Sequence, residues 1–432
     1  MYKLKKSDSV LKILVPYPTA HDIPSGVTVV LDGVIRELTK NLNVKIIRLI
    51  FQSEKISNLP ESDQFNEVVD IRNFDNAVDV LKKIQPDLIY TVPYVEFIAI
   101  SFLSAAKFLK IPTAGLVMIG FEKELKLKPT FFSNVRKIFS NSVPTDVYIN
   151  KTSFLRRLKF INYKISFMRR TFNKIFGNLS SFTKTKEVLL QSFSKNPFNP
   201  ELPLSKHFVL NIFQKNSLIK YGFKENDIII TGHPMFDLSF QENFIKKLDS
   251  EKSLNILFSP DTLAESGIWS KERQGKTIKD ILKTLNSIPD SLLKVKIHPA
   301  SAKINYYKPL IEEINPKIQI FQEGSIEPYL KTSDFIVVYS PYSTSLIYAM
   351  IHRIPIILCN FYDDMDDIFN LVSSNVAIEC KNIDSIKASI IDFKENQDTY
   401  EINRKNYIQN YLFSDDGKSS QRIASEILKL IK

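Results

Sequence analysis

Short apolar runs alternate with stretches of helical spacing along the first half of the chain. The first apolar run covers residues 10–15, and helical spacing follows over 28–42. Further apolar runs at 44–51, 87–92 and 113–119 are separated by polar or helical segments. Short buried strands that alternate with helices are typical of a parallel sheet covered by helices on both faces. The first half therefore predicts a doubly wound α/β domain.

The pattern begins again after a polar helical stretch at residues 239–252. Apolar runs at 254–259, 293–297, 334–339 and 355–359 are again separated by helical spacing. The predicted fold class is therefore α/β, with two doubly wound Rossmann-like domains that face a cleft. The expected boundaries are residues 1–240 for the first domain, 250–415 for the second and 416–432 for a C-terminal helix.

Two segments of the second half place polar side chains directly after predicted strands. The strand at 293–297 ends on His298, and Pro299 keeps a helix from following at once. The strand at 334–339 ends on a hydroxyl-rich turn before an apolar helix, whose N–H groups can bind an anion. Either motif alone is also typical of an ordinary loop or cap, but the pair at two strand ends predicts a phosphate site. The candidate residues are His298, Lys296, Ser340, Ser343 and Thr344.

Candidate catalytic groups follow the strands of the first half. His21 and Asp22 lie in the loop after the first strand, and Glu96 and Glu122 follow two later strands. A carboxylate or an imidazole at such an edge can act as the general base for an acceptor hydroxyl. His21 and Asp22 are the first candidates for this role, with Glu96 and Glu122 behind them. Turn formation and helix capping are the alternative roles for His21 and Asp22.

Residues 151–186 form a basic amphipathic segment. Lys and Arg interleave with Phe, Ile, Leu and Met there, and no Asp or Glu interrupts them. Such segments lie on anionic membranes, where the cations contact phosphates. An ordinary helical pair with a solvated basic face is an alternative, and RNA binding is a third, although no nucleic-acid module surrounds the segment and no nucleic-acid partner is expected. The residues expected to contact a membrane or an acceptor are Arg156, Arg157, Arg169 and Arg170.

Composition narrows the class of protein. The 432 residues suffice for two domains, and the net charge of +11 favours an anionic partner such as a phosphate-bearing metabolite or a membrane surface. The two cysteines indicate neither a disulfide framework nor a zinc site. The apolar run at 10–15 is too short for a signal peptide, and that at 97–106 is too short for a membrane span. We expect a cytoplasmic protein, or one peripheral on the inner face of the cell membrane.

Five segments together resemble the second half of GT-B-type surface-polysaccharide transferases. They are residues 231–237, 296–299, 334–344, 349–357 and 416–424. The likeness covers about residues 207–430 and is closest to CDP-glycerol glycerophosphotransferase-like and capsule transferases. Bacterial sialyltransferases and UDP-N-acetylglucosamine 2-epimerases are more distantly similar. The resemblance implies that His298, Ser343 and Thr344 bind the phosphates of a nucleotide, and that the first domain faces the acceptor.

The implied activity is transfer of a glycosyl or glycerophosphate-like group from a nucleotide-activated donor to a surface glycan or lipid-linked acceptor. The donor would be CMP-, CDP- or UDP-linked, and the product would enter cell-envelope polysaccharide. Neither a separate cofactor nor a metal is expected, since N–H, hydroxyl and cationic groups can stabilise a leaving phosphate. One alternative is an enzyme like the 2-epimerases, although Ser343 and Thr344 replace their glycine pair and Ile347 and Tyr348 occupy their acidic positions. The other is a non-catalytic scaffold for an anionic polymer or membrane.

Overall fold

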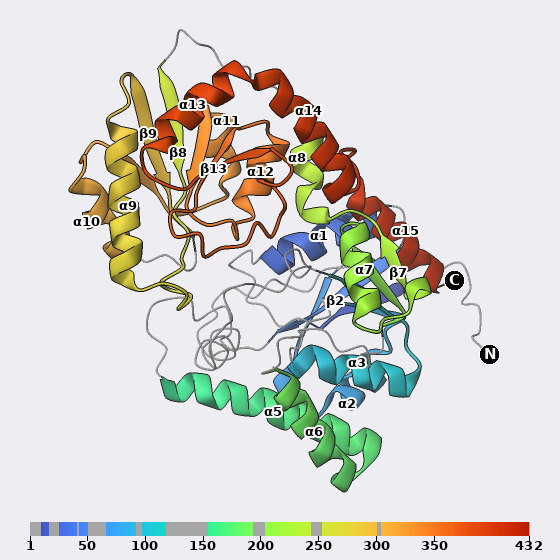
Figure 1. Ribbon diagram of the computed structural model, residues 1–432. Coiled ribbons are helices and arrows are strands. Elements are labelled where there is room, and N and C mark those ends of the chain that lie inside the picture. The colour runs from blue at the N-terminus through green and yellow to red at the C-terminus, as the bar shows by residue number, and fades with distance from the viewer. Residues whose placement is uncertain are drawn as a thin grey trace. The chain divides into compact units, whose positions relative to one another are not determined.

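The chain folds into two compact units, each built on one parallel sheet (Figure 1). Unit 1 holds the described residues up to 117, those from 154 to 237, and 417–431, while unit 2 holds 238–416. The computed structural model describes residues 10–16, 26–40, 43–50, 66–91, 97–117, 154–192, 204–242, 253–299 and 304–431.

Unit 1 contains a seven-stranded sheet in the order β3-β2-β1-β4-β5-β6-β7. Every strand pair in it is parallel, and the order reverses between β1 and β4, as in a doubly wound fold. The strands are β1 (Leu11–Val15), β2 (Val44–Ile50), β3 (Asn66–Asp70), β4 (Leu88–Thr91), β5 (Thr113–Leu116), β6 (Lys206–Val209) and β7 (Ile228–Ile230).

Helices cover both faces of this sheet, because neighbouring residues of a strand point to opposite sides. Ile13 of β1 packs with Val34 of α1 and Ile427 of α15, whereas the adjacent Leu14 packs in a cluster with Phe102 of α3. The helices are α1 (Gly26–Thr39), α2 (Ala77–Ile84), α3 (Phe97–Leu109), α5 (Phe154–Phe176), α6 (Asn178–Ser192), α7 (Ile212–Lys220) and α15 (Ser419–Ile431), with short 3-10 turns at Ile71–Asn73, Glu225–Asp227 and Pro234–Phe236.

Unit 2 contains a six-stranded parallel sheet in the order β10-β9-β8-β11-β12-β13. The order reverses between β8 and β11. The strands are β8 (Leu254–Phe258), β9 (Ser291–Lys296), β10 (Gln319–Phe321), β11 (Phe335–Val338), β12 (Ile356–Cys359) and β13 (Ala377–Cys380). The predicted α/β class with two doubly wound sheets is thus confirmed.

The helices of unit 2 bury an apolar stripe against its sheet. Ile256 and Phe258 of β8 lie in one core cluster with Ile278 and Leu282 of α9 and Ile386 of α13. The helices are α8 (Asp237–Gln241), α9 (Lys271–Asn286), α10 (Ile304–Glu312), α11 (Glu327–Lys331), α12 (Ser345–Ile351), α13 (Ser385–Glu395) and α14 (Gln397–Tyr407), followed by a π-helical turn at Ile408–Leu412. Among the helices that the structure describes, none is long and apolar enough to cross a membrane.

The last helix, α15, belongs to unit 1 and is held there by Asp237. The buried Asp237 carboxylate accepts hydrogen bonds from the N–H groups of Ser419, at 2.9 Å, and Ser420, at 2.7 Å. These are N–H groups of the first helical turn, which have no partner within a helix, and a carboxylate there also meets the positive end of the helix dipole. Arg422 adds a hydrogen bond from Nε to the carbonyl of Thr231, at 2.8 Å.

Two glycines allow α15 to approach this closely. A Cβ on Gly232 would lie 2.5 Å from Ser419 Oγ, and one on Gly33 would lie 2.8 Å from Ser420 Oγ. Both distances are shorter than real contacts. Gly232 also has a φ of +76°, in the left-handed region that side chains disfavour. Segments 231–237 and 416–424, both noted in the sequence, therefore contact each other.

Replacing Asp237 with Ala should loosen α15. Two buried N–H donors would lose a charged acceptor, so we expect the free energy of unfolding to fall by about 3 kcal/mol. Amide hydrogen exchange in α15 should accelerate at the same time. Glu225→Ala, which removes an exposed carboxylate paired with Lys215 in the same unit, is the control and should leave exchange in α15 unchanged. Equal exchange in wild type and Asp237→Ala would show that the carboxylate does not hold the helix.

Buried His233 makes the stability of unit 1 depend on pH. Burial lowers the pKa of His233 to about 3 from its usual 6.5, and Nδ1 accepts a hydrogen bond from Met235 N at 3.3 Å. Between these pH values His233 is protonated in the unfolded chain but not in the folded chain. The contribution of buried, neutral His233 to the free energy of unfolding is therefore complete above pH 6.5 and is lost as pH falls towards 3. Urea unfolding at several pH values should show that the free energy of unfolding falls less steeply with decreasing pH in His233→Asn than in wild type. A variant with the wild-type pH slope would contradict the assignment.

Candidate functional site

Polar side chains gather at the carboxyl edge of the unit 2 sheet. Because the strands are parallel, the segments that follow β8, β9, β11 and β12 all begin at this edge. The strand order reverses between β8 and β11, and open α/β sheets bind ligands outside the carboxyl ends of the strands at such a switch point. This edge is the candidate site.

The segment after β8 carries two carboxylates in a fixed setting. The Glu265 carboxylate accepts hydrogen bonds from Tyr307 Oη, at 3.0 Å, and from Gln274 Nε2, at 3.1 Å. The backbone carbonyl of Asp261 accepts hydrogen bonds from the hydroxyls of Tyr307 and Tyr339. Burial, with Glu265 close by, raises the pKa of Tyr307 far above its usual value, so its hydroxyl stays a donor. The Glu265 carboxylate is thereby held at the switch point, and the Asp261 carboxylate accepts a hydrogen bond from Thr262 N at 2.7 Å.

His298 follows β9 at the same edge. Its side chain reaches solvent, but surrounding chain removes enough water to lower the pKa of the imidazole below 6.5, against the opposing effect of the Asp261 and Glu265 carboxylates. Lys296 lowers that pKa further. The lowered pKa favours the neutral ring, which has one nitrogen that donates and one that accepts.

Lys296 forms hydrogen bonds that stabilise the backbone at this edge. Its side chain is buried, and Nζ donates to the carbonyls of Ile297, at 3.1 Å, and Gln322, at 2.7 Å. Burial lowers the pKa of Lys296 to about 8. The ammonium thus ties the end of β9 to the chain that leaves β10, and its charge lies close to His298.

The hydroxyl-rich turn after β11 positions its own serines. Buried Ser340 accepts a hydrogen bond from Tyr342 N at 3.2 Å, and Ser343 Oγ accepts one from Ser345 N at 3.3 Å. Ser343 and Ser345 also share a hydrogen bond between their hydroxyls, at 2.6 Å. Thr344 is exposed. Ser343 Oγ therefore contacts the first residue of α12, while Thr344, the N-cap residue, makes no capping hydrogen bond with its side chain, which is open to solvent.

The strand order sets the spacing between the two predicted motifs. His298 follows β9 and the hydroxyl turn follows β11, and β8 lies between these strands. Neighbouring strands are about 4.8 Å apart, so the two backbones leave the sheet about 10 Å apart with Asp261 between them. A nucleoside diphosphate is long enough to reach both motifs.

A stacked cation borders the edge near β12. The Arg273 guanidinium lies 4.1 Å from the ring centre of Trp269 and 3.7 Å from that of Tyr362, and Nη2 contacts Asp364 Oδ2 at 2.7 Å. Trp269 stacks in turn on Tyr339, with ring centres 5.4 Å apart. Trp269 and Tyr362 also contact each other edge to face, with ring centres 5.5 Å apart, so the two rings and the Asp364 carboxylate surround the guanidinium on three sides.

Four of these residues were not identified from the sequence: Asp261, Glu265, Arg273 and Asp364. One of them carried a usable signal. Asp261 lies just beyond an apolar strand, the position that identified His298. Arg273 and Asp364 are 91 residues apart and have no local pattern that joins them.

The predicted catalytic residues His21, Asp22, Glu96 and Glu122 lie outside the described residues. The side chains of Arg156 and Arg157 do too. β1 and β4, the strands that precede residues 17–25 and 92–96, are the pair between which the unit 1 sheet reverses its order.

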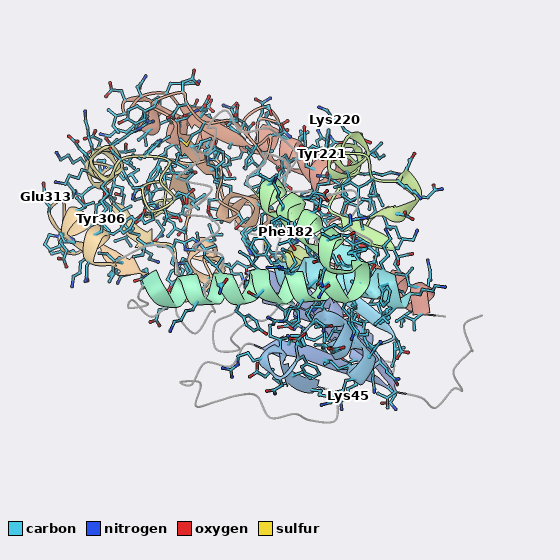
Figure 2. The ribbon with its side chains drawn as sticks, turned by 90° about the horizontal axis from the view of Figure 1, so that it is seen from below. Lys45, Phe182, Lys220, Tyr221, Tyr306 and Glu313 are labelled. Carbon is cyan, nitrogen blue, oxygen red and sulfur yellow. The ribbon has the colours of Figure 1, made fainter. Side chains whose placement is uncertain are left out.

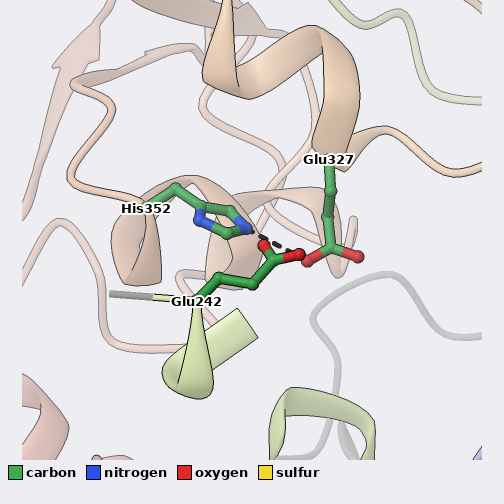
Figure 3. Close-up of side chains that lie close together, drawn as sticks. All are labelled: Glu242, Glu327 and His352. Atoms are coloured by element: carbon green, nitrogen blue, oxygen red, sulfur yellow. Dashed lines mark hydrogen bonds and ion pairs between the residues drawn. The ribbon is translucent and has the colours of Figure 1, made fainter. Parts of the chain in front are cut away.

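A separate cluster in unit 2 joins Glu242, Glu327 and His352 (Figure 3). Their ligand atoms lie within 4.8 Å of one another and could hold a metal ion. Burial would raise the pKa of Glu327, but hydrogen bonds with His352, at 3.0 Å, and Ser239 outweigh it and lower that pKa. Lys331 pairs with Glu242. The carboxylates thus already have partners, and the cluster ties α8 to α11 and α12.

Comparison with known proteins shows the fold. No protein-family model matches the sequence, and no curated protein matches it. Solved structures do match over nearly the whole chain. The UDP-GlcNAc 2-epimerase from Methanocaldococcus jannaschii is 16% identical with a TM-score of 0.51, covering 98% of this chain and 100% of that one. The enzyme from Neisseria meningitidis, bound to UDP-GlcNAc, is 15% identical with a TM-score of 0.53, covering 97% and 100%.

A glycosyltransferase is similar to the same degree. CalG4, the calicheamicin glycosyltransferase, is 10% identical with a TM-score of 0.53, covering 98% of both chains. At such identities the likeness is one of fold, and it does not distinguish a transferase from an epimerase. The chain has the GT-B-like fold that these epimerases and glycosyltransferases share.

Proposed function

We propose that the chain is a glycosyltransferase that uses a nucleotide-activated donor. The observation that carries the proposal is the switch-point edge of unit 2, where His298, the Asp261 segment and the Ser343 turn follow three neighbouring strands of a GT-B-like fold. A structurally similar S. aureus protein, MnaA, was solved with UDP, at a TM-score of 0.54. The proposed ligand of the edge is a CMP-, CDP- or UDP-linked donor.

In this proposal the edge stabilises the leaving nucleotide. The acceptor oxygen forms a bond to the transferred carbon or phosphorus, and the bond to the nucleotide's phosphate oxygen breaks with its electron pair. Negative charge then develops on that phosphate, where His298 and the hydroxyls of Ser343 and Thr344 donate hydrogen bonds. Lys296 adds its buried positive charge close to His298. These groups complete the step without a metal ion.

The carboxylates of Asp261 and Glu265 contact the transferred group in this proposal, and the general base acts on the acceptor. Because Glu265 is held by Tyr307 and Gln274, we assign it and Asp261 to the hydroxyl groups of the transferred sugar or glycerol. The general base that removes the acceptor's proton is Asp22 or His21, with Glu96 and Glu122 behind them. The acceptor is a surface glycan or a lipid-linked precursor, and the reaction contributes to cell-envelope polysaccharide on the cytoplasmic side.

A 2-epimerase-like activity is the second candidate. It is favoured by the matches to UDP-GlcNAc 2-epimerases, which cover nearly all of both chains. Ser343 and Thr344 stand against it, since the resemblance places a glycine pair at those positions in the epimerases.

Nucleotide binding should depend on His298 and Ser343. We expect one of the CMP, CDP, UDP, GDP and ADP conjugates to raise the melting temperature, because a ligand of the native state stabilises it by mass action. His298→Ala and Ser343→Ala should each raise Kd about tenfold, and turnover should fall about 100-fold. Ser385→Ala, at the start of α13, is the matched control. If both variants bind and turn over the donor like wild type, the site is elsewhere.

The affinity should also depend on pH through His298. The pKa of its imidazole is lowered in the free protein, and a bound phosphate favours the imidazolium form, so donor binding should tighten as pH falls below 6.5. A nucleotide sugar is the suitable ligand because its phosphates do not titrate in this range. Calorimetry should show the tightening in wild type and a flat profile in His298→Ala. A wild-type profile in that variant would exclude contact between the ring and phosphate.

The two candidate activities differ at carbon 2 of the sugar. Epimerisation must break the C2–H bond, so in heavy water an epimerase exchanges that hydrogen for deuterium, whereas a transferase leaves the donor intact until an acceptor arrives. We expect proton NMR of UDP-N-acetylglucosamine with the protein to show no loss of the H2 signal. Exchange at C2 or a second sugar isomer would establish the epimerase instead.

A further inference from the structure

Helix α5 of the basic segment packs one of its faces against the rest of unit 1. Phe167 packs in the cluster that contains Phe102 of α3, and Met168 and Phe172 pack in a cluster with Leu103. Thr171 Oγ1 accepts a hydrogen bond from Ala77 N at 3.0 Å. These apolar residues of α5 are therefore unavailable to any outside partner.

The Arg170 side chain also forms its contacts within unit 1. Its Nε donates to the Asp75 carbonyl at 2.7 Å and lies 2.8 Å from the Asp75 carboxylate. This contact joins α5 to the start of α2. Of the four arginines that the sequence suggested for a membrane or an acceptor, Arg170 thus serves the packing of the unit.

A different set of apolar residues is exposed where α5 turns into α6. Leu179 is 90% exposed, Phe182 62% and Phe176 43%. Gly177 makes the turn with a φ of +82°. Figure 2 labels Phe182 on α6, beside the long helix α5. We name this surface the hairpin tip, and it comprises Phe176, Leu179, Phe182, Arg169, Lys174, Lys184 and Lys186.

Cations lie directly over the exposed rings of the tip. Arg169 of α5 lies 6.0 Å from the ring centre of Phe182 of α6, and Lys184 of α6 lies 5.4 Å from that of Phe176 of α5. Each contact joins the two helices, so the apolar and basic groups form one surface. Lys174 and Lys186 are exposed beside it.

We propose that the hairpin tip docks the protein on an anionic membrane. Phe and Leu side chains enter the boundary between headgroups and acyl chains, while adjacent Lys and Arg side chains extend to lipid phosphates. Both kinds of group are present together at the tip. The proposal is independent of the proposed enzymatic function.

The charge and the exposed apolar side chains of the α5–α6 hairpin favour an anionic membrane over a second copy of the chain or a nucleic acid. Glu187 is the one acidic residue between positions 154 and 192, against nine Lys and Arg. A second copy of the same tip would bring like charges together. A nucleic acid would satisfy the cations but offers no apolar medium for Leu179, the most exposed of the three apolar side chains. An anionic bilayer satisfies both.

Vesicle sedimentation tests the proposal with the full chain. We expect wild type to pellet with phosphatidylglycerol–phosphatidylcholine vesicles and to stay in the supernatant with phosphatidylcholine alone. Leu179→Ser with Phe182→Ser should weaken partitioning roughly tenfold or more, because two apolar side chains no longer leave water. Lys174→Glu with Lys186→Glu should weaken it by a similar factor and reduce its sensitivity to salt.

Matched variants in unit 2 control for general surface effects. Leu292→Ser with Ile402→Ser removes two apolar side chains that are 55% and 60% exposed, and Lys276→Glu with Lys317→Glu reverses two exposed cations. Both should pellet like wild type, and circular dichroism should show that all variants are folded.

Three results would overturn the proposal. One is wild type in the supernatant with both kinds of vesicle. Another is pelleting that the tip variants and the unit 2 variants reduce equally. The third is gel filtration in which the tip variants convert a dimer to a monomer without any vesicle binding, since the tip would then join two copies of the chain.

Discussion

A buried carboxylate joins the last helix of unit 1 to the rest of that unit. Asp237 accepts the first N–H groups of α15, and the chain leaves unit 1 immediately after this residue and re-enters it at Gly417. Where the chain is described, its exit from unit 1 after residue 237 and its return at residue 417 thus both lie close in sequence to groups that this buried charge joins. The close contacts at Gly232 and Gly33 exist because α15 is held against them. Segments 231–237 and 416–424, two of the five that carry the resemblance to GT-B-type transferases, also form this internal contact.

The sheets were predictable because parallel strands buried on both faces leave continuous apolar runs in the sequence. β8 and β11 were found within a residue or two of their ends. His298 and Ser343 were noticed because they directly follow such runs. Arg273 was not, since its significance comes from Trp269, Tyr362 and Asp364, the last two about 90 positions away. Local patterns do not contain such contacts.

The charged residues show a different limit of sequence analysis. Lys296 is two residues from His298 and is predicted to contact a phosphate, and the structure adds that its ammonium donates hydrogen bonds to two backbone carbonyls, which the sequence does not indicate. Likewise, Phe167 and Phe182 look alike in a basic amphipathic segment, yet one is fully buried and the other mostly exposed. A helix that packs on its own domain and one that contacts a partner use the same residue types. Only the neighbouring elements decide which face is covered.

The return of α15 has a consequence for synthesis on the ribosome. Ile423 and Ile427 complete the core around β1 and α1, so unit 1 cannot finish folding until the whole of unit 2 has been translated. The described residues of unit 2 run from 238 to 416, so every strand described for this unit is translated before α15. The apolar surface of β1 and α1 that α15 covers in the folded protein therefore has no α15 to cover it while residues 238–416 are being translated.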